Sequence, residues 1–374
     1  MIQLAMQQPT TLIITGGHVT PALAVIDRIQ ERTLPVTIIF VGRKYNNNKE
    51  KTLSFEYQEV SKRSIPFIHL TTGRLTRIFN RASLVDFFQI PFGFVQSLMI
   101  VLKYKPHALL SFGGYLALPM ALVGSLLNVE IYTHEQTIEL GLTNRIIGNV
   151  SKRIFTSFPE TNHPTLTSKI TYTGNPLRND VLSQKSIQTY SHPLIYVTGG
   201  SLGSHTINEY IEHNLRKLLK KYHIIHQTGN VAEFDDFNRL SSLRRSLPSD
   251  MQKRYDVRAH VSSEEVGAIM QQADLVVSRS GANTFFELIA LAKPSVLIPL
   301  PWSAAQEQQK HAQILRDATV ATIIDQGDSD DHFLDVINTM MEKTSSYEKN
   351  FKELQGRYIA QASDAIIDAL FNKE

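Results

Sequence analysis

The stretch TLIITGGHVTPALAVIDRI, residues 11–29, joins an apolar strand to a helix through a turn that holds two glycines and a histidine. A second stretch of the same layout, VTGGSLGSHTINEYI, follows at residues 197–211, near the middle of the chain. A strand, a glycine turn and a helix begin a Rossmann-like domain, so two such starts in 374 residues predict two domains of this kind. The segment 173–193, rich in Pro, Asn and Ser, is expected to link them.

Short apolar segments alternate with helical patterns along most of the chain. Runs such as LIYVT and SVLIP are apolar throughout, which is typical of parallel strands that helices cover on both faces. The fold class is therefore α/β, with two doubly wound parallel sheets, and ligands are expected between them at the carboxyl ends of the strands. The pattern predicts strands at residues 11–15, 36–41, 108–112, 131–134, 194–198, 224–227, 275–278, 295–299 and 321–324.

The composition is that of an ordinary globular protein, with 42% hydrophobic and 20% charged residues. There is no cysteine, which excludes disulfides and thiolate metal sites. A net charge of +3 is too small to indicate nucleic-acid binding, but it is compatible with anionic small molecules or an anionic membrane surface. Asp328 and Asp330 have the D-x-D spacing of metal-dependent glycosyltransferases. They fall in the polar run QGDSDDH, so we expect a solvated loop there, and no metal or other cofactor.

The two TGG turns lack the established nucleotide fingerprints. Neither contains G-x-G-x-x-G or G-x-x-x-x-G-K-[ST], which argues against NAD-type and P-loop sites. In the first turn, Gly16 and Gly17 permit close approach of the backbone. Thr20 is expected to cap the following helix, and Pro21 suits its first turn. His18 stands at the mouth of that helix, where it either caps and packs or takes part in chemistry on a bound ligand.

Two further glycine turns follow predicted strands, SFGGYLALP at residues 111–119 and SRSGANTFFE at residues 278–287. In the second, the small residues 281–284 predict an open helix start that suits the oxygens of a pyrophosphate. Glu287 lies about one turn further along. Its carboxylate is either an acceptor for a vicinal diol such as a ribose or a solvated glutamate that the helix dipole favours. The spacing fits both interpretations equally.

The run HEQT, residues 134–137, places polar residues at the end of a predicted strand. His134 and Glu135 have the chemistry of an acid and a base. Neighbouring residues on a strand point to opposite faces, so we do not expect a direct pair between them.

The segment 73–105 concentrates apolar and basic side chains, which together suit the surface of an anionic membrane. We predict a membrane-facing patch over residues 75–92, where Pro91 is expected to break the helical pattern, and ordinary helix core over residues 94–102. The apolar members of the patch are Ile78, Phe79, Leu84, Phe87, Phe88, Ile90 and Phe92, and the nearby basic residues are Arg74, Arg77, Arg81, Lys103 and Lys105.

Seven motifs occur in the order that one bacterial family uses. They are TGGHVTPALAV, SFGGYLALP, HEQTIELGLTNRI, TGNPLR, VTGGSLGSHTIN, HQTGN and ADLVVSRSGANTFFELIALAKPSVLIPLP. Over residues 11–318 the chain resembles the MurG-type N-acetylglucosaminyltransferases of glycosyltransferase family 28. The resemblance implies a GT-B architecture, with an acceptor-binding, membrane-associated domain over residues 1–178 and a UDP-sugar domain over residues 179–354. It also implies that a helix within residues 355–374 packs back on the first domain.

The activity that the resemblance implies is an inverting, metal-independent transfer of N-acetylglucosamine from UDP-N-acetylglucosamine. The acceptor would be undecaprenyl-diphosphate-muramoylpentapeptide (lipid I), and the product would be lipid II of peptidoglycan biosynthesis. The implied partners are the UDP-sugar, the lipid-linked acceptor and an anionic inner-membrane surface, with the enzyme peripheral at its cytoplasmic face.

The motif positions carry the family's functional residues onto this sequence. His18 would be the general base for the acceptor hydroxyl or a diphosphate contact, Glu287 would take the ribose hydroxyls, and Val261 would offer its backbone to uracil. The donor side would comprise Thr15, Gly16, Gly17, Thr137, Arg178, Ser201, Val261, Arg279, Gly281, Ala282, Asn283, Thr284, Glu287 and Gln308, with Gln306 and Glu307 as rivals of Gln308. The acceptor side would comprise Gly113, Gly114, Tyr115, His134, Glu135, Gln136 and Asn144.

The sequence departs from the family's pattern at several positions within these motifs. The departures are Ile13 and Ile14 for two glycines, Thr137 and His311 for asparagines, Leu202 for a glutamine and Asn283 for a leucine. Three alternatives stay open beside the main hypothesis. They are a transferase acting on another lipid, a UDP-N-acetylglucosamine 2-epimerase on the same two-domain plan, and a protein that binds UDP-sugar without turnover.

Overall fold

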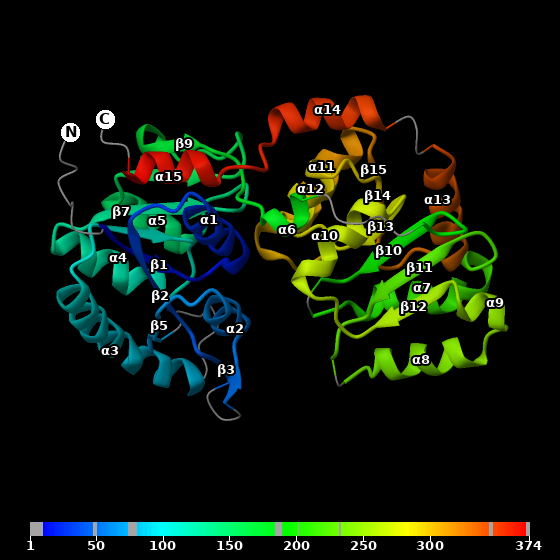
Figure 1. The fold of residues 1–374 in the computed structure, drawn as a ribbon, viewed down its shortest axis with the longest axis horizontal. Coiled ribbons are helices and arrows are strands. Elements are labelled where there is room, and N and C mark those ends of the chain that lie inside the picture. The colour runs from blue at the N-terminus through cyan, green and yellow to red at the C-terminus, as the bar shows by residue number, and fades with distance from the viewer. Residues whose placement is uncertain are drawn as a thin grey trace, which may run out of the picture. The chain divides into compact units, whose positions relative to one another are not determined.

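The structure is a computed structural model and describes residues 10–47, 51–73, 81–183, 189–200, 202–231, 233–343 and 347–371. The chain divides into two compact units (Figure 1). Unit 1 holds residues 1–178 and 361–374, and unit 2 holds residues 179–360.

Unit 1 is built on a seven-stranded sheet in the order β5-β2-β1-β6-β7-β8-β9. All of its strand pairs are parallel. The strands are β1 (Thr10–Thr15), β2 (Val36–Gly42), β5 (Phe67–His69), β6 (Ala108–Ser111), β7 (Glu130–Glu135), β8 (Arg153–Thr156) and β9 (Ile170–Tyr172). A small antiparallel pair, β3 (Tyr45–Asn47) and β4 (Thr52–Leu53), lies outside this sheet.

The helices of unit 1 cover both faces of the sheet, and all but the last of them lie between its strands in the sequence. They are α1 (Val19–Glu31), α2 (Phe55–Lys62), α3 (Arg81–Tyr104), α4 (Ala117–Leu126), α5 (Leu142–Val150), the 3₁₀ turn η1 (Thr167–Lys169) and α15 (Ser363–Phe371). The expectation that Pro91 breaks the helical pattern is wrong, because α3 runs through it. Close packing holds the helix there: a Cβ on Gly93 would collide with the Thr72 side chain, and the Ser97 hydroxyl donates to the Gly93 carbonyl at 2.7 Å.

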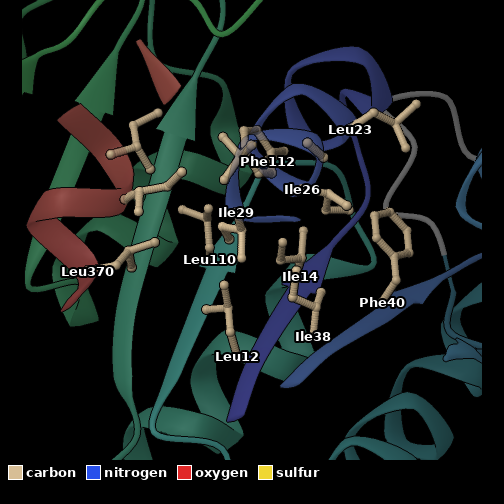
Figure 2. Packing of buried hydrophobic residues seen from close by; sticks show 14 of the residues in the cluster. Leu12, Ile14, Leu23, Ile26, Ile29, Ile38, Phe40, Leu110, Phe112 and Leu370 are labelled. Atoms are coloured by element: carbon tan, nitrogen blue, oxygen red, sulfur yellow. The ribbon is translucent and has the colours of Figure 1, made fainter. Parts of the chain in front are cut away.

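The central strand β1 has apolar residues on both faces, as a strand between two helical layers requires. Leu12 and Ile14 pack with Ile26 of α1 and Leu110 of β6 on one face (Figure 2). Ile13 belongs to the core of the opposite face. Ile13 and Ile14 are therefore both fully buried, and each contributes about 1.5–3 kcal/mol through burial. The two isoleucines that replace family glycines fill the two cores and do not line a ligand site.

The helix α15 comes from the end of the chain and completes unit 1. It packs beside α1 (Figure 1), and its Ile366, Ile367 and Leu370 enter the same core as Leu12. Arg28 of α1 forms two hydrogen bonds of 2.9 Å with Asp364. The returning segment begins at Gln361, later than the boundary expected at residue 355, because residues 355–357 still belong to the last helix of unit 2.

Unit 2 contains a six-stranded parallel sheet in the order β12-β11-β10-β13-β14-β15. Its strands are β10 (Leu194–Thr198), β11 (His223–Gln227), β12 (Tyr255–Arg258), β13 (Leu275–Ser278), β14 (Ser295–Leu297) and β15 (Ala321–Ile323). Its helices are α6 (Asn179–Leu182), α7 (His205–Leu218), α8 (Asp236–Ser246), α9 (Ser249–Gln252), α10 (Ser263–Gln272), α11 (Ala282–Ala290), α12 (Glu307–Asp317) after the 3₁₀ turn η2 (Ala304–Gln306), α13 (Asp330–Glu342) and α14 (Glu348–Arg357). The predicted α/β class with two parallel sheets is thus confirmed.

Candidate functional site

Two glycine turns meet at the carboxyl ends of β1 and β6 in unit 1. The His18 amide donates to the Phe112 carbonyl at 3.0 Å, so the TGGH turn is bonded to the SFGG turn. A Cβ on Gly17 would collide with the Gly113 carbonyl. Gly113 and Gly114 have φ angles of +74° and +76°, in the left-handed region that favours glycine. These glycines therefore allow the backbones of the two turns to touch. The His18 side chain lies at the surface beside this contact.

His18 is the N-cap residue of α1, and its side chain forms no capping hydrogen bond within the described residues. The residue is exposed. Thr20, expected as the cap, lies inside the helix because the first turn begins at Val19. Although the residue is exposed, the dense protein around the turn partly desolvates the imidazole and lowers its pKa below the ordinary value of 6.5, while the nearby Glu135 carboxylate acts in the opposite direction. A lowered pKa keeps His18 neutral at pH 7, which is the form that accepts a proton.

Glu135, at the end of β7, holds together the loop that follows it. Its carboxylate accepts hydrogen bonds from the Gly141 amide at 2.8 Å and from the side-chain amide of Asn144 at 2.9 Å. The backbone amide and hydroxyl of Thr137 also donate to it, at 3.1 and 2.8 Å. Asn144 is buried and accepts in turn from Thr133 at 2.8 Å. Thr137 and Asn144 therefore both bind Glu135, and the three residues support the loop around residues 136–141.

His134 points away from Glu135, as the strand alternation predicts. Its Nε2 lies 3.2 Å from the Ser157 hydroxyl, which in turn lies 3.2 Å from the Oδ1 of Asn175. Burial lowers the pKa of His134 to about 3, and the neighbouring His18 adds to this effect. Its Nδ1 and the side-chain nitrogen of Asn175 have no hydrogen-bond partner within the described residues. His134 is thus a neutral, internal histidine, and no acid–base pair forms between it and Glu135.

The TGG turn of unit 2 connects β10 to α7. Ser204 caps α7, its hydroxyl accepting from the Ile207 amide at 3.4 Å. Gly200 has a φ of +84°, and no other described atom would lie within 4 Å of a Cβ placed on it. The side-chain amide of Gln227, at the end of β11, donates to the Gly200 carbonyl at 3.1 Å. Ser201, predicted to contact the donor diphosphate, lies outside the described residues.

The SGAN turn between β13 and α11 has the open helix start that its sequence predicts. Gly281 is the N-cap, and a Cβ there would meet no described atom within 4 Å. Ala282 is buried, whereas Asn283 and Thr284 are partly exposed in the first turn. Glu287 follows in the second turn and is buried, with 8% exposure. The interpretation of Glu287 as a solvated first-turn glutamate is therefore wrong, because α11 turns this side chain toward the protein.

The side chains around the SGAN turn mostly bind the protein itself. Arg279 donates to the Ile298 carbonyl at 2.8 Å, and burial lowers its pKa to about 10. Gln308 accepts from the Leu300 amide at 3.0 Å, and its carbonyl accepts from the Ser280 hydroxyl at 2.7 Å. His311 is buried, with its Nδ1 3.0 Å from the Ser280 carbonyl. The start of α12 is thus tied to the SGAN turn.

The remaining predicted residues divide between buried and exposed positions. Gln306 is exposed with a left-handed φ of +54°, and Glu307 begins α12. Tyr115 is partly exposed beside the SFGG turn. The buried members are Thr15, Gln136, Arg178 and Val261.

The predicted membrane patch falls partly outside the described residues. Ile78 and Phe79 are not described, and neither is the side chain of Phe87. Beyond them, α3 exposes an apolar ridge, which we call the α3 ridge, whose members are 54% to 73% exposed: Phe88, Phe92, Val95, Met99 and Leu102. Their spacing of four, three, four and three residues places them on one face. The prediction of core over residues 94–102 is therefore wrong for Val95, Met99 and Leu102, whereas Ile100 and Val101 are buried as expected.

No group of three or more His, Asp or Glu side chains that could hold a metal occurs in the described part of the chain. Asp330 begins α13 and pairs with His213 at 3.1 Å, and the Asp328 carboxylate accepts from the Asp325 amide at 2.9 Å. In the ranges that the structure covers, no helix is both long enough and apolar enough to cross a membrane.

Sequence reasoning missed Glu56, which lies next to the TGGH turn. This residue of α2 is buried, and its carboxylate accepts a hydrogen bond from the Arg43 amide. Burial raises its pKa. A Cβ on either Gly16 or Gly42 would meet this carboxylate. Nothing near Glu56 in the sequence signals this contact, because α1, β2 and the β3–β4 pair separate it from the TGGH turn.

Comparison with known proteins agrees with this geometry. The N-terminal and C-terminal domain models of glycosyltransferase family 28 match residues 13–156 and 194–366. A UDP-N-acetylglucosamine–N-acetylmuramyl-(pentapeptide) pyrophosphoryl-undecaprenol N-acetylglucosamine transferase 2 of Bacillus cereus is 31% identical, covering 95% of this chain and 99% of its own. A transferase of the same kind from Borrelia garinii is 28% identical, covering 92% of this chain and 91% of its own.

Solved structures establish the GT-B fold. The crystal structure of Acinetobacter baumannii MurG matches with a TM-score of 0.71 and 23% identity, over 98% of this chain and all of that one (100%). A UDP-N-acetylglucosamine 2-epimerase from Neisseria meningitidis matches with a TM-score of 0.67 and 13% identity, over 97% of this chain and 100% of that one. Because both domain models match and the Bacillus cereus relative aligns over nearly its whole length, the chain belongs to glycosyltransferase family 28.

Proposed function

We propose that this protein transfers N-acetylglucosamine from UDP-N-acetylglucosamine to undecaprenyl-diphosphate-muramoylpentapeptide, forming lipid II in peptidoglycan biosynthesis. Its relatives of nearly full length are named for this reaction. The observation that carries the chemistry is the position of His18, which is exposed and uncapped at the carboxyl ends of β1 and β6. Because its pKa is lowered, it is a neutral imidazole at physiological pH, ready to accept the proton of an acceptor hydroxyl.

Unit 1 would hold the acceptor. In an inverting displacement, the acceptor hydroxyl attacks the anomeric carbon as His18 removes its proton, and the bond from that carbon to the UDP oxygen breaks. Glu135, Thr137 and Asn144 would act indirectly, by keeping the loop after β7 in place. Gly113, Gly114 and Tyr115 would line the acceptor side beside His18.

Unit 2 would hold the donor. The leaving group is a diphosphate, whose negative charge is stabilised by amides at a helix N-terminus. The α7 and α11 helices begin at Gly-containing turns whose surroundings are open at Gly200 and Gly281. Glu287, one turn inside α11, would accept the ribose hydroxyls, and the backbone near Val261 would meet uracil. Arg279 and Gln308 bind the turns themselves, so we assign them to positioning the donor site.

The α3 ridge supports attachment to a membrane surface. A contiguous row of exposed Phe, Val, Met and Leu side chains is suited to insertion among lipid headgroups, and Lys103 and Lys105 stand at its C-terminal end. We therefore place the enzyme at the cytoplasmic face of the inner membrane, where its lipid-linked acceptor would be found.

A UDP-N-acetylglucosamine 2-epimerase is the second candidate, because enzymes of that activity share the fold. An epimerase needs neither a lipid acceptor nor the apolar ridge on α3. Two further candidates, transfer to another lipid and UDP-sugar binding without turnover, share the donor site and differ in what unit 1 does.

One assay separates these functions. Purified protein is incubated with UDP-N-acetylglucosamine and a short-chain lipid I, and released UDP and sugar products are measured. UDP release that requires lipid I supports the proposed transfer. Epimerised sugar without acceptor would establish the second candidate instead. Donor binding with no UDP release from lipid I, but release with a diacylglycerol acceptor, would reassign the acceptor. Binding without release from either acceptor would show a protein that only holds UDP-sugar.

A further inference from the structure

In unit 2, the GGSLG loop, described at residues 199–200 and 202–203, lies directly against a second loop, which we call the TGN loop and which is described at residues 228–231 and 233–235. A Cβ on Gly203 would collide with the Thr228 carbonyl, and a Cβ on Gly229 would collide with the Leu202 carbonyl. Both glycines have a φ near +80°, at +82° and +78°. The two loops therefore touch backbone to backbone, and the conformation of one depends on the other.

Asp236, the first residue of α8 and the residue directly after the TGN loop, is where side chains from α7 and α8 converge. Its carboxylate accepts from Nδ1 of His205 at 2.9 Å, from the side-chain nitrogen of Asn208 at 2.7 Å and from Arg239 at 2.7 Å. His205 and Asn208 belong to the first turn of α7, which begins directly after the GGSLG loop. The His205 ring also stacks on Phe234 of the TGN loop, with centroids 4.0 Å apart and planes 11° apart. Asp236 is buried, with 6% exposure.

The hydrogen bonds behind Asp236 run in one direction. Asn208 donates to Asp236 and to the Thr228 carbonyl, so its oxygen accepts from Nε2 of His226 at 2.9 Å. Nδ1 of His226 then accepts from the Tyr255 hydroxyl, also at 2.9 Å. Burial lowers the pKa of His226 to about 3, which keeps it neutral as this order requires. The row of hydrogen bonds from Tyr255 through His226 and Asn208 therefore ends at the Asp236 carboxylate.

We propose that His205 and Asp236 form a clamp that sets the shape of the diphosphate-binding GGSLG loop, and that both are positioning residues for UDP-sugar binding. The inference rests on the proposed donor site in unit 2. The nitrogens of His205 face carboxylates of the protein, with Nε2 3.3 Å from Glu209, so His205 acts through the loop and not as a phosphate ligand. The clamp joins the start of α7 to the TGN loop, whose Gly229 contacts Leu202.

The test compares His205→Ala, His205→Asn and Asp236→Asn with the native enzyme. His205→Ala and Asp236→Asn are expected to weaken UDP binding, measured by calorimetry, and to raise the KM for UDP-N-acetylglucosamine by about tenfold, the size of one lost hydrogen bond to a charged group. The KM for lipid I and kcat should change less than twofold. His205→Asn keeps a donor near the carboxylate and should restore part of the affinity. The double variant should lose no more than the worse single variant, because both break the same contact.

The matched control is His213→Ala. His213 lies on the same helix and pairs with Asp330 at 3.1 Å, two turns away from the GGSLG loop. It should leave the donor KM unchanged. Thermal unfolding of all variants shows whether each is folded.

Hydrogen–deuterium exchange gives a second readout that needs no ligand. Amides of residues 199–204 should exchange faster in His205→Ala than in the native protein. In His213→Ala their exchange rates should equal those of the native protein. If the loop exchanges faster in His205→Ala but the native protein binds no UDP, the clamp is supported and the proposed function is refuted. Unchanged exchange together with donor binding within twofold of native, in folded His205→Ala and Asp236→Asn, would overturn the clamp.

Discussion

Gly17 and Gly113 lie back to back, with no space between them for a side chain on Gly17. Gly17→Ala should therefore push the TGGH turn away from the SFGG turn. We expect a loss of about 1–3 kcal/mol in the free energy of unfolding, as for other overpacked sites, and a fall in transfer activity because His18 moves.

Chemical denaturation and UDP-release assays measure both effects. Gly356→Ala is the control, since Gly356 lies in α14 with nothing described within 4 Å of an added Cβ. That change should stabilise the helix by about 0.5–1 kcal/mol and leave activity unchanged. Native stability in Gly17→Ala would contradict the tight contact.

His18→Ala should lower kcat by roughly 100-fold or more, the usual contribution of a general base, with little change in stability because the residue is exposed and caps nothing. Full turnover in this variant would remove His18 from the chemistry.

The same residue predicts a pH dependence. The neutral ring is the active form and its pKa lies below 6.5, so kcat should be constant at neutral pH and fall as pH drops through the lowered pKa. His18→Ala should lose this acidic limb. An acidic fall in kcat that is the same in His18→Ala as in the native enzyme would argue against His18 as the titrating base.

Glu287→Ala should raise the Kd for UDP by about tenfold, because the ribose hydroxyls would lose a charged acceptor. Since Glu287 is buried, a small loss of stability should accompany the effect. Glu353→Ala, an exposed glutamate of α14, provides the comparison and should change neither property. Equal UDP affinity for Glu287→Ala and the native protein would exclude the ribose contact.

Phe92→Ser combined with Met99→Ser should weaken binding to vesicles that contain anionic lipid by at least tenfold, since each apolar side chain contributes about 1.5–3 kcal/mol on leaving water. Sedimentation with the vesicles measures it. Leu142→Ser removes an exposed apolar residue that lies off α3 and should have no effect. If all these proteins bind vesicles equally, the α3 ridge has another role.

Acid should destabilise the fold through its buried histidines. The pKa values of His134, His226 and His311 are lowered by burial to about 3, 3 and 4. Unfolded histidines titrate near 6.5, so the unfolded chain binds more protons as pH falls from about 6.5 toward these values. Stability should drop by up to about 1.4 kcal/mol per pH unit for each histidine. Urea titrations at pH 7.5, 6 and 5 measure the slope, and a midpoint independent of pH would contradict the buried neutral state.

The sequence predicted the central strands better than the edges of the sheets. The strands β10 and β13 begin and end where expected. Each is a largely apolar run that ends directly before a glycine-containing turn, which begins at Gly199 after β10 and at Arg279 after β13. The strands β5, β8 and β9 are three or four residues long and mix polar with apolar residues, so no period distinguishes them from loops. Their strand conformation depends on neighbours in the sheet.

For the candidate site, the motifs identified the loops but not the partners of their side chains. The HEQT motif indicates polar chemistry after β7, yet Glu135 is surrounded by donors from residues 137–144 that only the folded loop brings to it. The contact between Glu56 and Gly16 joins segments that are separated by a helix, a strand and a hairpin. Contacts of this kind depend on tertiary packing, so a linear motif does not predict them.

The return of α15 to α1 fixes the order in which this enzyme can mature on the ribosome. The residues that cover Leu12, Ile14 and Ile26 include Ile366, Ile367 and Leu370, and these are translated after the whole of unit 2. Unit 2 has its complete sequence once Ala360 has left the exit tunnel, whereas unit 1 still waits for residues 361–374. The first half of the protein to be synthesised is therefore the second to be finished, and its exposed apolar face is a natural client for chaperones during that interval.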